Sequence, residues 1–251
     1  MSLLRFGPLL GLGAAACLLS SAVLLPTSTA GFTSVQTNAQ NSWAAGQRFR
    51  PPTVDLGSAA AYSVLAWTDV SNSGKTVLSE ALGVSPGATV VGFPPGVARG
   101  GMHLAGPGAA EAQADLMRAY DKARALAPTD TFSGDQNAVT FTPGVHFTGA
   151  AFALTGTMTL DGQGDPNASF IFQIDAAMDT AAASRMVLVG GARATNIFFL
   201  VTGAAGTGAA SHVEGTIIAV GAITVGAGAV VHGRVLSRGK ITLSSNTITT
   251  S

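Results

Sequence analysis

The histidines are the first side chains that could bind a metal or move a proton. They lie at positions 103, 146, 212 and 232, and no two of them have the spacing of metal ligands. The sequence contains no recognisable Ser-His-Asp arrangement and no glycine-rich phosphate loop. We therefore expect no catalytic residue, no metal and no cofactor.

The carboxylates also predict neither catalysis nor a metal site. Enzymes that cleave polysaccharides need clustered acidic residues in a groove, whereas the acidic residues here are scattered along the chain. Asp161, Asp165 and Asn167 could suggest a calcium loop, but their spacing departs from the EF-hand pattern. We interpret this segment as a turn.

Threonines, in contrast, recur at spacings that suit a β-sheet. Neighbouring residues of a strand point to opposite sides, so the alternation of Thr155, Thr157 and Thr159 predicts three threonines on one face. In the repeat described below, Thr159 aligns with Thr224 and Thr242. Residues two positions apart on a strand are separated by about 6.6 Å, and equivalent residues on neighbouring strands by about 4.8 Å. Because threonine is stiff at χ1 and carries both a methyl and a hydroxyl group, a flat, weakly polar grid is expected.

Composition favours one β-rich domain without a charged partner. The chain has 251 residues, 32 of them glycine, and only 6% are aromatic, which suits a fold of tight corners and small side chains. Thirteen basic residues balance thirteen acidic ones, so no net field attracts nucleic acid or anionic lipid. We expect a monomer that does not bind nucleic acid.

The C-terminal third contains an 18-residue repeat, because residues 213–230 align without a gap with residues 231–248. One repeat in extended conformation traces about 60 Å, which suits one coil with three short faces. Two unrelated glycine-rich hairpins are the alternative. The matching pairs are Val213/Val231, Gly215/Gly233, Ile217/Val235, Ile218/Leu236, Gly221/Gly239, Ile223/Ile241, Thr224/Thr242, Val225/Leu243 and Val230/Ile248.

Segments 169–174 and 196–201 resemble residues 215–220 and extend the repeat upstream. This register predicts a face that is apolar on both sides and must therefore be covered. A helix within Pro107–Ala127, bounded by glycine and proline and rich in alanine on one side, is the expected cover. The predicted columns are Ile171, Phe198, Ile217 and Val235, and beside them Phe172, Phe199, Ile218 and Leu236.

The N-terminus has the pattern of an export signal. Arg5 precedes an almost continuously apolar run from Leu9 to Leu25, and small residues predict cleavage after Ala30. We therefore predict a signal peptide at 1–30, a linker or lead-in segment at 31–52, and one domain at 53–251. An uncleaved signal as membrane anchor and lipidation of Cys17 are the alternatives. The mature chain would be secreted or attached to the cell surface, and it would contain no cysteine.

Several motifs, in order, resemble the microbial ice-binding (antifreeze) protein family over about Val54–Thr249. They are residues 54–66, Leu82-Gly-Val-Ser-Pro-Gly87, Gly92-Phe-Pro-Pro-Gly96, Glu111-Ala-Gln-Ala-Asp-Leu116, residues 160–168, Phe170-Ile-Phe-Gln-Ile174, Val213-Glu-Gly-Thr216 and Asn246-Thr-Ile-Thr249. The resemblance implies an all-β-dominated, right-handed, three-faced parallel β-solenoid. The solenoid is discontinuous, with one long α-helix alongside and the N-terminal strands beside the last coil.

The resemblance also implies adsorption to ice through one flat sheet face, which would inhibit ice growth or recrystallisation. Thr207, Ser245 and Thr247 fall where family members often carry a Thr-Gly/Ala-x-Thr/Asn pattern, so they join the threonines named above as candidate ice-binding residues. This sequence departs from that pattern at Thr207-Gly-Ala-Ala210 and Ala227-Gly-Ala-Val230, which predicts moderate activity.

Two other functions stay open. The scaffold could serve as a non-catalytic cell-surface or matrix protein without ice activity, in which case the threonines are only β-favouring surface residues. Polysaccharide cleavage is the enzymatic alternative. Placement of Thr157, Thr159, Thr224 and Thr242 on different faces, or beneath the helix, would remove the predicted site.

Overall fold

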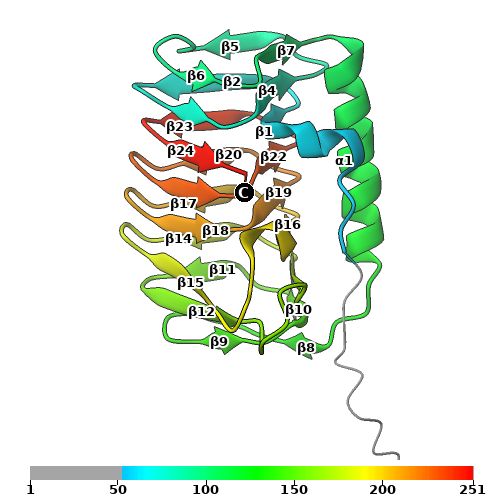
Figure 1. Cartoon of the computed structure of the whole chain (residues 1–251), viewed down its shortest axis with the longest axis vertical. Helices are drawn as coiled ribbons and strands as arrows, with labels where there is room; N and C mark the ends of the chain where they lie inside the picture. The colour runs from blue at the N-terminus through cyan, green and yellow to red at the C-terminus, as the bar shows by residue number, and fades with distance from the viewer. Residues whose placement is uncertain (1–52, 251) are drawn as a thin grey trace, which may run out of the picture. The chain divides into compact units, whose positions relative to one another are not determined.

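The computed structural model describes residues 53–250. The predicted signal peptide at 1–30, the predicted lead-in segment at 31–52 and Ser251 lie outside the described residues. All described residues belong to one compact unit, in which short parallel strands form three sheets around a common interior (Figure 1). The predicted three-faced β-solenoid with one helix alongside is confirmed.

Each sheet is named here and its strands are given in spatial order. Sheet A consists of β7 (Met102–Leu104), β4 (Ala81–Val84), β1 (Tyr62–Ala66), β22 (Val235–Ser237), β19 (Thr216–Ala219), β16 (Ile197–Val201), β13 (Phe170–Ile174), β10 (Gly144–Thr148) and β8 (Asp130–Thr131). Sheet B consists of β11 (Phe152–Leu154), β14 (Met178–Thr180), β17 (Ala205–Thr207), β20 (Ile223–Val225), β23 (Ile241–Ser244), β2 (Asp69–Ser73) and β5 (Thr89–Val91). Sheet C consists of β6 (Val97–Ala98), β3 (Val77–Leu78), β24 (Thr247–Thr249), β21 (Val230–His232), β18 (His212–Glu214), β15 (Arg185–Val189), β12 (Thr157–Asp161) and β9 (Thr140–Phe141).

The order of the coils in space differs from their order in the sequence. Strands β1, β2 and β3 pair with β22, β23 and β24 respectively, so the N-terminal coils stack on the last C-terminal coil. Figure 1 shows the last strands, in red, in the middle of the stack. The solenoid is therefore discontinuous, as the family resemblance implied.

The interior of the coils is filled by one side of most strands. Phe152, Phe172 and Phe199 are fully buried there, and the rings of Phe172 and Phe199 stack with centroids 4.8 Å apart. Short strands suffice because stacked coils bury one another's apolar side chains, which supplies the main driving force of folding.

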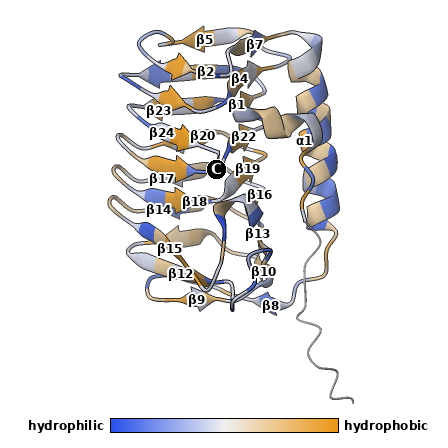
Figure 2. Cartoon of the chain, viewed as in Figure 1, coloured by the Kyte–Doolittle hydropathy of each residue, from blue (hydrophilic) through white to orange (hydrophobic). Residues whose placement is uncertain are grey.

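The outward side of sheet A is also apolar, and helix α1 (Pro107–Arg124) covers it. Leu116 and Ala112 of the helix pack in one buried cluster with Ile218 and Leu236 of the sheet. Alanine at the contact lets the helix lie close to the sheet. Hydrophilic residues follow the side of α1 that faces away from the sheets (Figure 2). The helix was predicted within Pro107–Ala127, and both the helix and its covering role are confirmed.

Side-chain hydrogen bonds fasten the helix at its middle and at its C-terminal end. Ser58, in the 3-10 helix η1 (Gly57–Ala61), donates from its backbone N–H (2.8 Å) and its hydroxyl (2.6 Å) to Oδ2 of Asp115. Buried Gln173 donates from Nε2 to the backbone oxygens of Ala123 and Leu126, both at 3.0 Å. These oxygens belong to the helix end, where carbonyls lack partners within the helix.

The 18-residue period is confirmed for most of the predicted pairs, including Ile217 with Val235 and Thr224 with Thr242. Three predicted alignments are wrong, and the one that involves Thr159 is described with the candidate site. Phe199, and not Phe198, pairs with Ile217.

The second error lies in the last coil. Val231, and not Val230, pairs with Ile248. Thr224 pairs with Thr242, 18 positions later, whereas Val230 pairs with Thr247, 17 positions later, so the last coil has one residue fewer between these two faces.

Candidate functional site

Two of the three solenoid faces are open within residues 53–250, because α1 covers only sheet A. Seven coils contribute a strand to sheet B and another to sheet C, and alternate residues of each strand point outward. A flat binding surface must therefore lie on sheet B or on sheet C.

The structure divides the predicted threonines between these two faces. Thr224 pairs with Thr242 on sheet B, whereas Thr159 pairs with Thr140 and Val187 on sheet C. The predicted alignment of Thr159 with Thr224 and Thr242 is wrong, because β12 belongs to the next face of its coil. The single grid expected from the sequence does not exist.

Sheet C also carries Thr157 and Thr247, but they are far apart in the stack. The outward column that contains them continues from Thr157 through Arg185, His212 and Val230 to Thr247. Charged, ionisable and apolar side chains thus separate the two threonines.

Three further predicted residues do not belong to the outward columns of sheet B or sheet C. Thr155 is at the corner between β11 and β12 and donates its backbone N–H (2.9 Å) and its hydroxyl to the carboxylate of Asp135. The hydrogen bond from the hydroxyl and, to a smaller extent, the one from the backbone N–H lower the pKa of Asp135. Ser245 is an exposed corner residue with φ +50°. Thr207 is only 6% exposed, because its neighbour Gly206 takes the outward position.

Sheet B contains a compact group of outward hydroxyls around Thr224 and Thr242. Ser71 pairs with Thr242 on the next coil, and Ser73 pairs with Ser244. Since Ser71 and Ser73 alternate on β2, as Thr242 and Ser244 do on β23, the spacings are about 6.6 Å along the strands and about 4.8 Å between them. We name Ser71, Ser73, Thr224, Thr242 and Ser244 the hydroxyl cluster.

A rigid layer supports the hydroxyl cluster from below. Val70, Ile223, Val225, Ile241 and Leu243 alternate with the cluster residues and are at most 1% exposed. Continuous parallel pairing of β20, β23 and β2 fixes the backbone. Because buried side chains are closely packed, the hydroxyl positions can hardly shift relative to one another.

The outward face of sheet C has a different chemistry. Glu214 pairs with His232 on the next coil, and Nδ1 of His232 lies 2.8 Å from Oε1 of Glu214. Arg185 and the exposed Val187 and Val189 lie on β15. This face mixes strongly hydrated groups with bulky apolar ones, so it offers no uniform hydroxyl surface.

His146, Asp161 and Asp165 serve local structure. His146 is 1% exposed, and its ring nitrogens lie 2.7 Å from Oδ1 of Asp130 and 3.0 Å from the backbone oxygen of Thr142. Asp161 and Asp165 accept backbone N–H groups two residues ahead, as in Asx turns. Within residues 53–250, no group of three or more His, Cys, Asp or Glu side chains could hold a metal ion.

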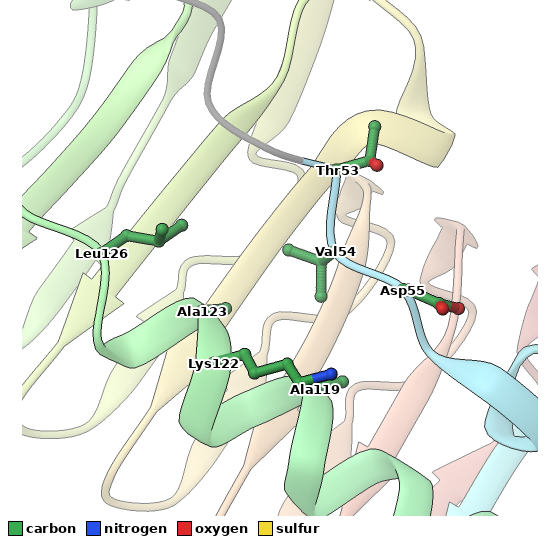
Figure 3. Close-up of a pocket in the computed structure, with 7 residues that line it drawn as sticks. All are labelled: Thr53, Val54, Asp55, Ala119, Lys122, Ala123 and Leu126. Atoms are coloured by element: carbon green, nitrogen blue, oxygen red, sulfur yellow. The ribbon is translucent and has the colours of Figure 1, made fainter.

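A pocket of about 310 Å³ lies where the first described residues pass the end of α1 (Figure 3). Val54 and Leu126 point into it, while the oxygens of Asp55 point away. An apolar lining without converging polar groups offers little for specific recognition. The lining residues are Thr53, Val54, Asp55, Ala119, Lys122, Ala123 and Leu126.

Fold and site together define a parallel β-solenoid with a cluster of outward hydroxyls on one of its two open faces. The family model "Ice-binding-like" matches residues 64–249. The chain belongs to this ice-binding-like family.

Individual relatives agree with this assignment. An ice-binding protein of Nostoc sp. (strain HG1) is 40% identical over 166 residues, which are 66% of this chain and 61% of the Nostoc protein. Ice-binding protein K3-B1 of Typhula ishikariensis is 32% identical over 67% of this chain and 78% of its own length. The crystal structure of an ice-binding protein from an Antarctic biological consortium matches 81% of this chain and 93% of its own with a TM-score of 0.79 and 36% identity.

Among the described residues, no helix is long and apolar enough to span a membrane. The predicted uncleaved anchor would lie within residues 1–30, outside that range.

Proposed function

We propose that this protein binds ice and slows its growth or recrystallisation through the outward face of sheet B. Family membership supports the activity, and the hydroxyl cluster is the observation that supports the site. Of the eight residues predicted from the sequence, Thr224 and Thr242 belong to this cluster. Ser71, Ser73 and Ser244 join them.

The chemistry of the cluster suits a crystalline partner. Its hydroxyls can donate and accept hydrogen bonds, and the threonine methyls add apolar contact. A rigid array loses little conformational entropy on adsorption, because its geometry exists before binding. Charged faces suit ice less well, since carboxylates and ammonium groups hold their own water strongly.

We further propose that the protein acts outside the cell, as a monomer and without catalysis. The apolar run from Leu9 to Leu25 supports export, and the scattered acidic residues and locally engaged histidines support a non-catalytic role. A cell-surface or matrix protein without ice activity is the competing proposal.

An ice-recrystallisation assay on the chain from Gly31 onward tests the function and the site. We expect the parent protein to keep ice grains small and Thr224→Tyr to lose most of this effect, since a bulky ring would lift sheet B off a flat crystal. Thr247→Tyr makes the same change on sheet C and should behave as the parent. Ordinary grain growth with the parent protein would overturn the proposed function.

A further inference from the structure

The outward column of sheet B runs from Ala153 on β11 to the exposed Val91 on β5, and between these two ends it has two unlike halves. From β20 to β2 the column consists of Thr224, Thr242 and Ser71, which belong to the hydroxyl cluster. From β17 towards β14 it continues with Gly206 and Asp179. We name the segment of Gly206 and Asp179 the recessed half.

The recessed half is hollow. A depression of about 340 Å³ lies over β14, β17 and β20, between Asp179 on one side and Thr224 on the other. Gly206 contributes no side chain to fill it, and the neighbouring Ala204 and Ala222 contribute only methyl groups. A flat crystal placed on the hydroxyl cluster would therefore stand off from sheet B over these coils.

The side chain of Asp179 occupies the space above the glycine. A Cβ at position 206 would lie 2.5 Å from Oδ1 of Asp179, so the carboxylate leans over the glycine backbone. Desolvation of part of the carboxylate raises the pKa of Asp179. At neutral pH this exposed carboxylate holds water of its own, and that hydration competes with an ordered ice-like layer.

From these contacts we infer that Gly206 and Asp179 limit the ice-contact area of sheet B and determine how strongly the protein adsorbs. The inference rests on the proposed function. With hydroxyls at both positions, the column would extend from three consecutive coils to five. The backbone permits this change, because Gly206 lies within β17 without the positive φ that favours glycine, and threonine suits strands.

The test compares the full chain, as recovered from expressing cells, with Asp179→Thr/Gly206→Thr in a recrystallisation assay. We expect the double variant to inhibit recrystallisation at about tenfold lower concentration, equivalent to about 1.4 kcal/mol of added adsorption free energy. His212→Thr/Val230→Thr is the control, because it also introduces two threonines, which lie next to Thr247 in the outward column of sheet C. This control should match the parent protein.

Equal or weaker inhibition by Asp179→Thr/Gly206→Thr would overturn the inference, as would an equal gain in the sheet C control. Thr224→Tyr, measured alongside, separates the two proposals. If Thr224→Tyr loses activity while the double variant gains none, only the inference fails; if Thr224→Tyr keeps full activity, the proposed site fails.

A second variant covers the case in which the double variant does not fold. Asp179→Asn keeps the shape of the side chain and removes the charge, and we expect a smaller gain from it. No gain from a folded Asp179→Asn protein would then overturn the inference.

Discussion

Sheets A and B are built from the same coils, yet their outward faces differ completely. On sheet A the outward residues are large and apolar, such as Ile218 and Leu236, and α1 buries them. On sheet B the equivalent side of the next strand carries Thr224 or Thr242, which remain at the surface. One face of each coil thus holds the molecule together, and another remains free to bind.

Residues that stabilise the fold and residues that bind ice should therefore lie on different sheets. Outward residues of sheet A should affect the free energy of unfolding and leave adsorption unchanged in the folded protein. Outward residues of sheet B should affect adsorption to ice and leave the free energy of unfolding nearly unchanged. Substitutions at matched positions on the two sheets test whether these roles are separate.

The largest effect on stability is expected beneath the helix. Leu236→Ala leaves a cavity between β22 and α1, and such substitutions cost about 2–5 kcal/mol. Thr242→Ala, a few residues further along the same coil, should cost less than about 1 kcal/mol, because surface substitutions have small effects. Urea unfolding followed by circular dichroism measures both. Similar losses for the two variants would contradict this separation of roles.

A smaller loss is expected at the C-terminal end of the helix. Gln173→Ala removes the Nε2 group that serves Ala123 and Leu126 and leaves buried carbonyl oxygens without this donor. The expected cost is about 1–3 kcal/mol. The folded variant should still inhibit recrystallisation as the parent does, and a loss of inhibition without a loss of stability would link sheet A directly to function.

The contact between η1 and α1 should depend on acid. Hydrogen bonds from Ser58, and then from Arg118, lower the pKa of Asp115 to about 2. Because the folded-state pKa lies below the ordinary value of 3.8, the stabilisation is present above about pH 4 and is lost as the pH falls through about 2.

Thermal unfolding of the parent and of Asp115→Asn between pH 2 and pH 6 measures this contribution. The two curves should converge at the acid end. A constant difference between the two melting temperatures over this range would show that the carboxylate charge contributes nothing.

The smallest effect is expected on sheet C. Glu214→Gln removes the charge opposite His232, whose side chain is 46% exposed. Exposed ion pairs contribute about 0–1 kcal/mol, so both stability and recrystallisation inhibition should stay near the parent values. A marked loss of inhibition would place the contact surface on sheet C and not on sheet B.

The sequence predicted the coil correctly because glycine and β-branched residues recur with a period of 18. It misplaced Phe198 by one residue, since segments 197–201 and 216–219 are buried at every position and apolar at all but Thr216. A shift of one residue in such a strand exchanges one apolar side chain for another, so the pattern contains no signal for the register.

The binding face was harder to predict than the coil. Thr157 and Thr159 alternate as any solvent-facing strand does, and alternation does not reveal which of the three faces the strand belongs to. Ser71 and Ser73 were missed because their neighbours are on β23, about 170 positions later in the chain. Only the stacking of the N-terminal coils on the last coil brings these hydroxyls together.

Retention of the protein in slowly growing ice tests the central claim most directly. Labelled parent protein, Thr224→Tyr and Thr247→Tyr are mixed separately with water that freezes from a cold surface, and the fraction trapped in the ice is measured. We expect the ice to retain the parent and Thr247→Tyr and to exclude Thr224→Tyr. Retention of Thr224→Tyr equal to that of the parent, or exclusion of Thr247→Tyr, would contradict sheet B as the ice-binding face.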